Sequence, residues 1–256
     1  MILDHVTWVV VDTETTGPDP DRHKPVEIAA LRFHGTEQLG RFVTLVNPAQ
    51  PIPPESSGVH NITDIDVAEA PSVEEALAEL AEFISGAGMV VAHNAAFDRE
   101  FLTTIRQPAA NARGEIEWDW LCTWRLARHL LPMAPNHKLA TLRYLRKLDV
   151  PRDIAAHRAL GDVIVTAALT LDLVHLYEER FADDADLDEL LEYALSYITL
   201  PAWPFGKYFG RPIADAPANY IRWVLRNHDR AQRDRDLRKT LESELLRMSR
   251  RLTLAS

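Results

Sequence analysis

Residues 9–17 read VVVDTETTG, a run of three valines that passes without a break into acidic residues and threonines. The β-branched residues predict a buried strand. Side chains alternate across a strand, so Asp12 and Glu14 lie on the same face. Two neighbouring carboxylates repel each other unless a cation lies between them, and hard oxygen ligands suit magnesium or manganese. The alternative is an acidic turn after an ordinary strand, and this fragment alone does not distinguish a metal site from such a turn.

Length and composition indicate a soluble globular protein with one large core, or one core and a small appendage. The chain has 256 residues, of which 46% are hydrophobic and 26% charged. Cys122 is the single cysteine, which excludes an intrachain disulfide and a cysteine-based zinc site. The N-terminus lacks the pattern of a signal peptide, and we expect no apolar run long enough to span a bilayer. We therefore expect a cytoplasmic protein.

The charge is divided unevenly along the chain. Residues 1–200 contain 16 Lys and Arg against 32 Asp and Glu, a net charge of −16. Residues 201–256 contain 12 against 6, a net charge of +6. The asymmetry suggests an acidic body and a basic tail that meets phosphates, although a solvated charged helix explains the tail equally well.

The N-terminal half predicts a mixed sheet. Residues 26–33 and 42–46 are β-rich and should pair antiparallel with the first strand. Residues 47–63 contain four prolines, so we expect an irregular loop, which is a candidate substrate contact. Ser72 and Glu75 have capping-box spacing before a helix that covers the sheet.

Further strands and helices complete an α/β pattern. Residues 89–92 are a short buried strand, parallel to the first because a crossover helix separates the two. Asp98 falls in the first turn of the following helix, where it has the alternative role of favouring the helix dipole. We expect a strand at 118–121 and helices at 122–131, 138–148 and 157–177.

His157 and Asp162 stand at the start of the last of these helices. With 3.6 residues per turn, both can face one site at its N-terminal end. A lone histidine in this position is more often structural. The C-terminal part predicts an acidic helix and linker at 181–204 and then a basic segment at 205–256, with a tight loop at 204–212 and helices at 219–227 and 230–252.

These four carboxylates and the histidine come from three distant segments, and together they resemble the motifs of the DEDD family of 3′–5′ exonucleases in its histidine-bearing branch. The resemblance covers residues 6–175. It implies an exonuclease domain at residues 1–180 with a ribonuclease H-like mixed sheet flanked by helices, followed by a small C-terminal α+β appendage.

The resemblance also implies roles for single residues. Asp12, Glu14 and Asp162 would hold the first of two Mg²⁺ or Mn²⁺ ions, Asp12 would bridge to the second, and Asp98 would complete the set directly or through water. His157 would be the general base. The remaining matched positions would contact substrate: Thr13, Thr15, His60, His93 and Asn94.

The C-terminal tail resembles one particular group within this family. Residues 205–225, FGKYFGRPIADAPANYIRWVL, and residues 121–131, LCTWRLARHLL, resemble the exodeoxyribonuclease X group of bacterial DNA exonucleases associated with repair. We hypothesise that four cations of the tail help hold DNA: Lys207, Arg211, Arg222 and Arg226. The expected activity is release of nucleoside 5′-monophosphates from DNA 3′ ends, preferably single-stranded. The alternatives are a proofreading or RNA-trimming exonuclease and a catalytically inactive DNA-binding or docking module.

Overall fold

The computed structural model describes residues 1–103, 119–151, 157–181 and 185–254. Two compact units make up the chain, Met1–Ala194 and Leu195–Ser256. The boundary between them falls inside the segment that we expected to be an acidic helix and linker, residues 181–204.

The first unit is built on a five-stranded sheet with the order β3-β2-β1-β4-β5. Strands β1, β2 and β3 pair antiparallel, whereas β4 pairs parallel with β1 and β5 parallel with β4. The mixed sheet is therefore as predicted. The strand bounds are β1 (Thr7–Thr15), β2 (Pro25–His34), β3 (Glu37–Leu45), β4 (Met89–Ala92) and β5 (Trp120–Cys122).

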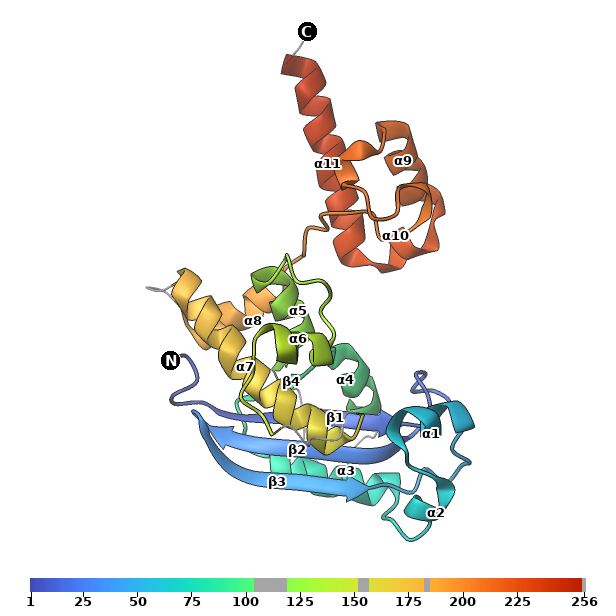
Figure 1. Cartoon of the computed structure of the whole chain (residues 1–256), viewed down its shortest axis with the longest axis vertical. Coiled ribbons are helices and arrows are strands. Elements are labelled where there is room, and N and C mark those ends of the chain that lie inside the picture. The colour runs from blue at the N-terminus through green and yellow to red at the C-terminus, as the bar shows by residue number, and fades with distance from the viewer. Residues whose placement is uncertain (104–118, 152–156, 182–184, 255–256) are drawn as a thin grey trace, which may run out of the picture. The chain divides into compact units, whose positions relative to one another are not determined.

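Helices cover both faces of the sheet, with α3 (Val73–Ile84) on one face and α7 (Ala159–Phe181) on the other (Figure 1). Strand β1 serves both layers because its side chains alternate. Trp8 and Val10 pack in the cluster that contains α7, and Val9 and Val11 pack in the cluster that contains α3. The other helices of the first unit are α1 (Pro54–His60), α2 (Asp64–Val67), α4 (Ala95–Thr103), α5 (Thr123–Leu130), α6 (Leu139–Leu145) and α8 (Leu187–Leu195).

Helix α3 begins as the sequence predicts. The Ser72 hydroxyl accepts a hydrogen bond from the Glu75 backbone N–H at 3.3 Å, and the Glu75 carboxylate accepts one from the Ser72 backbone N–H at 2.8 Å. This reciprocal capping box satisfies two backbone donors that have no partner inside the helix.

The prediction that residues 47–63 are irregular throughout is wrong. Helix α1 (Pro54–His60) lies within them, and α2 (Asp64–Val67) follows directly. Pro54 occupies the first turn of α1, where proline removes no intrahelical hydrogen bond and its fixed φ suits the helix. Counting prolines without their position in the turn gave the wrong expectation.

Helix α7 also departs from expectation. By length and composition it is apolar enough to cross a membrane, although we expected no such run. Its apolar residues lie in the core of the first unit instead, where Leu169, Leu173 and Val174 are fully buried. This is the pattern of the core helix of a soluble protein.

The second unit has its own small core, to which Leu200 and Trp203 of the expected linker contribute. Among its described residues, β structure is limited to isolated bridges that pair Ala202 with Pro212 and Trp203 with Phe209. Its other regular elements are helical: η1 (Gly206–Tyr208), η2 (Ile213–Asp215), α9 (Ala218–Asn227), α10 (Asp229–Arg233) and α11 (Arg235–Leu254).

The single helix predicted for residues 230–252 is divided in two. The chain becomes extended at Asp234, with φ −89° and ψ 101°, and the Asp234 carboxylate accepts a hydrogen bond from the Leu237 N–H at 3.0 Å. Aspartate is a favoured N-cap, so Asp234 ends α10 and begins α11.

Replacing a core leucine of α7 tests this packing. Leu169→Ala removes a fully buried side chain and should lower the free energy of unfolding by about 3 kcal/mol. Leu145→Ala is the matched control, because Leu145 is 45% exposed and its loss should cost less than about 1 kcal/mol. Urea denaturation of the two variants measures the difference, and equal losses would contradict the buried position of Leu169.

Candidate active site

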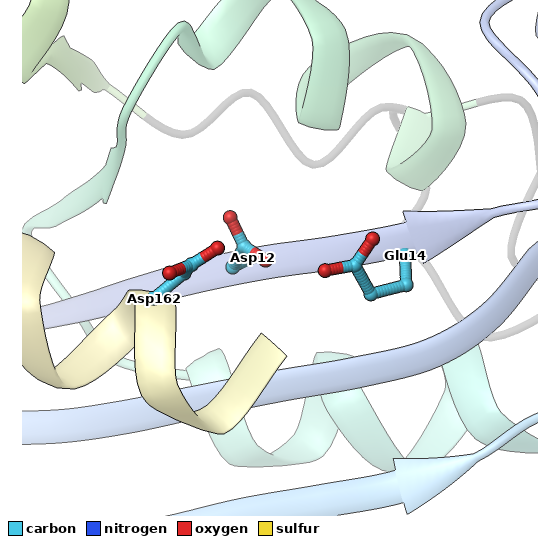
Figure 2. Close-up of side chains that lie close together, drawn as sticks. All are labelled: Asp12, Glu14 and Asp162. Carbon is cyan, nitrogen blue, oxygen red and sulfur yellow. The ribbon is translucent and has the colours of Figure 1, made fainter. Parts of the chain in front are cut away.

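Three carboxylates meet where β1 ends and α7 begins. Asp12 and Glu14 come from β1 and Asp162 comes from the first turn of α7 (Figure 2). One oxygen from each residue lies within 4.8 Å of the others. In an octahedral magnesium site, ligand oxygens on opposite sides of the ion are about 4.2 Å apart. The three carboxylates are close enough together to be candidate ligands of one hard divalent cation.

The alternation of β1 explains this meeting. Asp12 and Glu14 continue the side of the strand that carries Trp8 and Val10, which is the side covered by α7. The parallel pairing of β1 with β4 reaches only Val10, so Asp12 and Glu14 lie beyond the part of β1 that pairs with β4, although they still pair with β2. Ligand sites in α/β folds commonly lie beyond the carboxyl ends of the strands.

The electrostatics favour a bound cation. Burial raises the pKa of Asp12 well above its ordinary value, and the charges of Asp98, Asp162, Glu14 and Glu27 raise it further. Burial and the charge of Asp162 raise the pKa of Glu14 to about 8, although Arg158 partly opposes the shift. Burial likewise raises the pKa of Asp162. A divalent cation would supply the positive charge that these carboxylates lack.

Asp98, on α4, is not a member of this group of three, although its charge is the largest neighbouring charge that acts on Asp12. Its Oδ1 accepts hydrogen bonds from the Thr13 backbone N–H at 3.0 Å and from the Thr13 hydroxyl at 2.9 Å. Burial raises the pKa of Asp98 to about 7, while the bonds from Thr13 act in the opposite direction. Thr13 lies between Asp12 and Glu14 and therefore points to the other face of β1, which is where Asp98 meets it.

His157 precedes α7 and its side chain is exposed. Its backbone is in the left-handed region, with φ 58°, which is uncommon for a residue other than glycine. His157 lies close enough to Asp162 that its charge and a hydrogen bond from its backbone lower the pKa of that carboxyl, against the larger effect of burial. The structure thus brings the predicted histidine beside the carboxylate of the same motif.

An ion pair between the buried Glu27 and the partly exposed Arg158, which the sequence analysis missed, fixes the start of α7. Glu27 of β2 is 2% exposed, and its carboxylate accepts hydrogen bonds from Arg158 Nη2 at 2.6 Å and from the Ala159 backbone N–H at 2.8 Å. Glu27 also stands opposite Glu14 in the β1–β2 register. The available signal was a lone acidic residue inside an apolar strand, because a buried charge requires a partner.

The other predicted contact residues make hydrogen bonds within the protein. The Thr15 hydroxyl donates to the Gly17 carbonyl at 2.8 Å, and the buried His60 Nδ1 accepts from the Ile62 N–H at 3.1 Å. His93 pairs through Nδ1 with the Thr123 hydroxyl and through Nε2 with the His137 carbonyl, each at 2.9 Å. Burial lowers the pKa of His93 to about 4, so it is neutral.

Asn94, Lys207 and Arg211 are exposed. Asn94 has φ 73° in the turn between β4 and α4. Lys207 and Arg211 belong to the second unit.

A mixed sheet with clustered carboxylates at the end of β1 and the start of α7 is the arrangement that the sequence resemblance implied for a ribonuclease H-like hydrolase. The profile of the family described as Exonuclease matches residues 9–170, and the chain belongs to that family. The family predicted from the motifs is thereby confirmed. A second profile, described as Putative quorum-sensing-regulated virulence factor, matches residues 192–228.

Individual relatives agree with the family. The chain is 32% identical to exodeoxyribonuclease 10 of Escherichia coli (strain K12), over 92% of this chain and 97% of that protein. It is 39% identical to a DNA polymerase III subunit epsilon-like protein of Rhodobacter capsulatus, over 70% of this chain but 25% of that protein.

A solved structure of exonuclease X in complex with 5′ overhanging duplex DNA matches with a TM-score of 0.57 and 30% identity, over 73% of this chain and 99% of that one. Escherichia coli exonuclease I in complex with a dT13 oligonucleotide shares the fold, with a TM-score of 0.57 and 21% identity, over 70% of this chain and 43% of that one.

Removing the Glu27 carboxylate should weaken the whole site. Glu27→Ala leaves the Arg158 guanidinium and the Ala159 N–H without their acceptor, and we expect a loss of about 2 kcal/mol in the free energy of unfolding. Glu79→Ala is the matched control, because Glu79 is exposed on α3 and its loss should change stability by less than about 0.5 kcal/mol. Thermal unfolding of both variants measures the effect, and an unchanged Glu27→Ala protein would contradict the anchoring role.

Stability should depend on pH in a direction set by the raised pKa values of Glu14 and Asp98. The folded protein without metal holds protons that the unfolded chain releases, so its free energy of unfolding should fall as pH rises from about 4 to about 8. Added magnesium requires the deprotonated carboxylates, so it should raise the unfolding temperature more near pH 8 than near pH 6. Thermal unfolding with EDTA or excess MgCl₂ measures this, and equal stabilisation at both pH values would contradict it.

Proposed function

We propose that this protein is a 3′–5′ exodeoxyribonuclease that removes nucleoside 5′-monophosphates from DNA 3′ ends by two-metal-ion hydrolysis. The observation that carries the proposal is the cluster of Asp12, Glu14 and Asp162 with oxygens within 4.8 Å of one another. The family membership and the similarity to an exodeoxyribonuclease over nearly the whole chain support it.

Asp12, Glu14 and Asp162 would hold Mg²⁺ or Mn²⁺, and Asp98 would complete the set for a second ion directly or through water. When bound, the two cations activate a water molecule and stabilise the attacking and leaving oxygens at phosphorus. Thr13 orients the Asp98 carboxylate with two hydrogen bonds, so Asp98 cannot turn freely. The Glu27 carboxylate accepts a hydrogen bond from the Ala159 N–H and so fixes the backbone between His157 and Asp162.

His157 would take a proton from the attacking water. Histidine is the side chain best suited to proton transfer near neutral pH, and His157 is solvent-exposed beside Asp162. A base at this point must be accessible to the substrate and close to the carboxylates. His157 meets both conditions.

The substrate assignment follows from the relatives. The similarity to an exodeoxyribonuclease extends over 92% of this chain, and a matched exonuclease structure of 30% identity contains duplex DNA. We therefore infer action on DNA 3′ ends, preferably single-stranded, in the cytoplasm and in DNA repair. Thr15, His60, His93 and Asn94 stay predicted substrate-site positions, and exposed Asn94 is the one best placed to touch a strand directly.

The alternative functions differ in substrate or in chemistry. Similarity to a polymerase subunit epsilon-like protein supports a proofreading exonuclease as the second candidate. An RNA-trimming enzyme would share the same metal site. A catalytically inactive DNA-binding or docking module is disfavoured, because a decayed site would have lost at least one member of the acidic set and none is lost here.

Two substitutions test the assigned chemistry on labelled DNA and RNA oligonucleotides with Mg²⁺ or Mn²⁺. Asp12→Ala removes the carboxylate shared by both ions and should reduce the rate by about 1,000-fold or more. His157→Ala should reduce it by about 100- to 10,000-fold while magnesium still stabilises the fold. Faster cleavage of DNA than of RNA by the unmodified protein would support the exodeoxyribonuclease.

His175→Ala is the matched control, because His175 lies on the same helix as Asp162 and is exposed. Its Nε2 pairs with Glu179 Oε1 at 3.3 Å, and neither residue belongs to the acidic cluster. Its activity should equal that of the unmodified protein. Full activity of Asp12→Ala or His157→Ala would reject the role of that residue.

A further inference from the structure

One face of α9 in the second unit combines positive charge with an exposed aromatic ring. Asn219, Arg222, Trp223 and Arg226 are all exposed and follow helical spacing, whereas Ile221 and Val224 on the opposite side are fully buried. Trp223 is 53% exposed, although tryptophan has a large apolar surface. The core of the unit therefore does not account for this face.

The ring of Trp223 continues into a row of aromatic side chains. It stacks on Tyr220 with centroids 6.1 Å apart and an interplanar angle of 27°, and Tyr220 contacts Tyr208 at 4.9 Å. Lys207 Nζ and Arg211 Cζ lie over the Tyr208 ring at 5.7 and 5.8 Å. We call this surface the α9 patch, which consists of the half-buried Tyr220 and five exposed residues: Lys207, Arg211, Arg222, Trp223 and Arg226.

The close packing beneath the patch needs a glycine. Gly206 has φ 74°, and a side chain there would meet the Tyr220 hydroxyl at 2.9 Å. A side chain at residue 206 would therefore be strained and would displace the Tyr220 ring that packs against Tyr208.

The cations of the patch are mostly available to an external anion. Among the residues that the structure describes, Lys207, Arg222 and Arg226 form no ion pair, and Arg211 pairs with Asp215 at 3.5 Å. The cations of α11 differ, because Arg238 and Lys239 both contact Glu242, at 3.0 and 3.8 Å. With a net charge of +6 over residues 201–256, this unit is complementary to a polyanion.

We propose that the α9 patch binds single-stranded DNA, with a base stacked on Trp223 and phosphates held by Arg222, Arg226 and Lys207. An exposed ring surrounded by unpaired cations is the combination that binds single strands, because their bases offer free π-faces while their backbone carries the charge. In a duplex the faces of the bases are stacked on one another, so only the phosphates could contact the α9 patch and no base could stack on Trp223. The patch rests on the proposed function in one respect: it would retain the strand whose 3′ end the first unit degrades.

The aromatic contribution is tested by binding. Full-length protein in EDTA, which prevents cleavage, is titrated into a fluorescent oligothymidylate of about 20 nucleotides, and anisotropy reports the affinity. Trp223→Ala should weaken binding about tenfold, whereas Trp223→Phe keeps a stacking ring and should restore most of the affinity. Unchanged binding by Trp223→Ala would overturn the proposal, as would equal binding of the oligothymidylate and a blunt duplex of the same length.

The electrostatic contribution is tested by salt dependence. The double variant Arg222→Ala with Arg226→Ala should lower the slope of log affinity against log salt concentration by about 1.4, since each phosphate contact with a single strand contributes about 0.7. Arg238→Ala is the matched control, because it removes one positive charge that already pairs with Glu242. Equal effects in the double variant and the control would reject a localised patch and indicate general charge attraction.

A second substrate separates this proposal from the proposed function. The p-nitrophenyl ester of thymidine 5′-monophosphate offers one phosphodiester and no strand, so its hydrolysis reports only the first unit. Trp223→Ala should hydrolyse it at the unmodified rate while degrading long single strands more slowly at low substrate concentration. If the unmodified protein binds the oligothymidylate through Trp223 but cleaves neither substrate, the proposed function fails and the patch stands.

Discussion

The active site depends on the contact between Glu27 and the start of α7. Asp12 and Glu14 belong to β1, whereas Asp162 and His157 belong to α7, and the side-chain contacts of Glu27 join β2 to α7 at that point. Glu27 stands opposite Glu14 in the β1–β2 ladder, and its charge adds to the repulsion that raises the pKa of Glu14, which Arg158 opposes only in part. The ion pair therefore fixes the start of α7 beside the cluster but does not neutralise the cluster.

The period of β1 assigns its residues to two sides of the sheet. Asp12 and Glu14 point to α7 and form the cluster with Asp162, while Thr13 points to the other side and holds Asp98 on α4. One short stretch thus supplies two carboxylates of the cluster and also orients a further acidic residue. The raised carboxyl pKa values of Asp12, Glu14, Asp162 and Asp98 are the electrostatic cost of that convergence, and bound cations would relieve it.

The two units carry opposite chemistry. The first gathers carboxylates in a half-buried site, which would repel a phosphate backbone until cations are bound, and the second exposes unpaired cations around Trp223. This separation explains why the net charge of the whole chain, −10, says little about its affinity for nucleic acid. A local patch of charge and an exposed ring decide that affinity.

The sequence by itself determined the strand that ends in Asp12 and Glu14, the capping box at Ser72, the mixed sheet and the family, because periodicity, caps and motif spacing are local properties. It could not give the two hydrogen bonds from Thr13 to Asp98, the Glu27–Arg158 pair, or the helix at Pro54–His60. It also could not show that the chain turns at Asp234 or that Trp203 is buried while Trp223 is exposed. Only the tertiary structure decided these points, because each depends on which distant side chains a residue meets once the chain has packed.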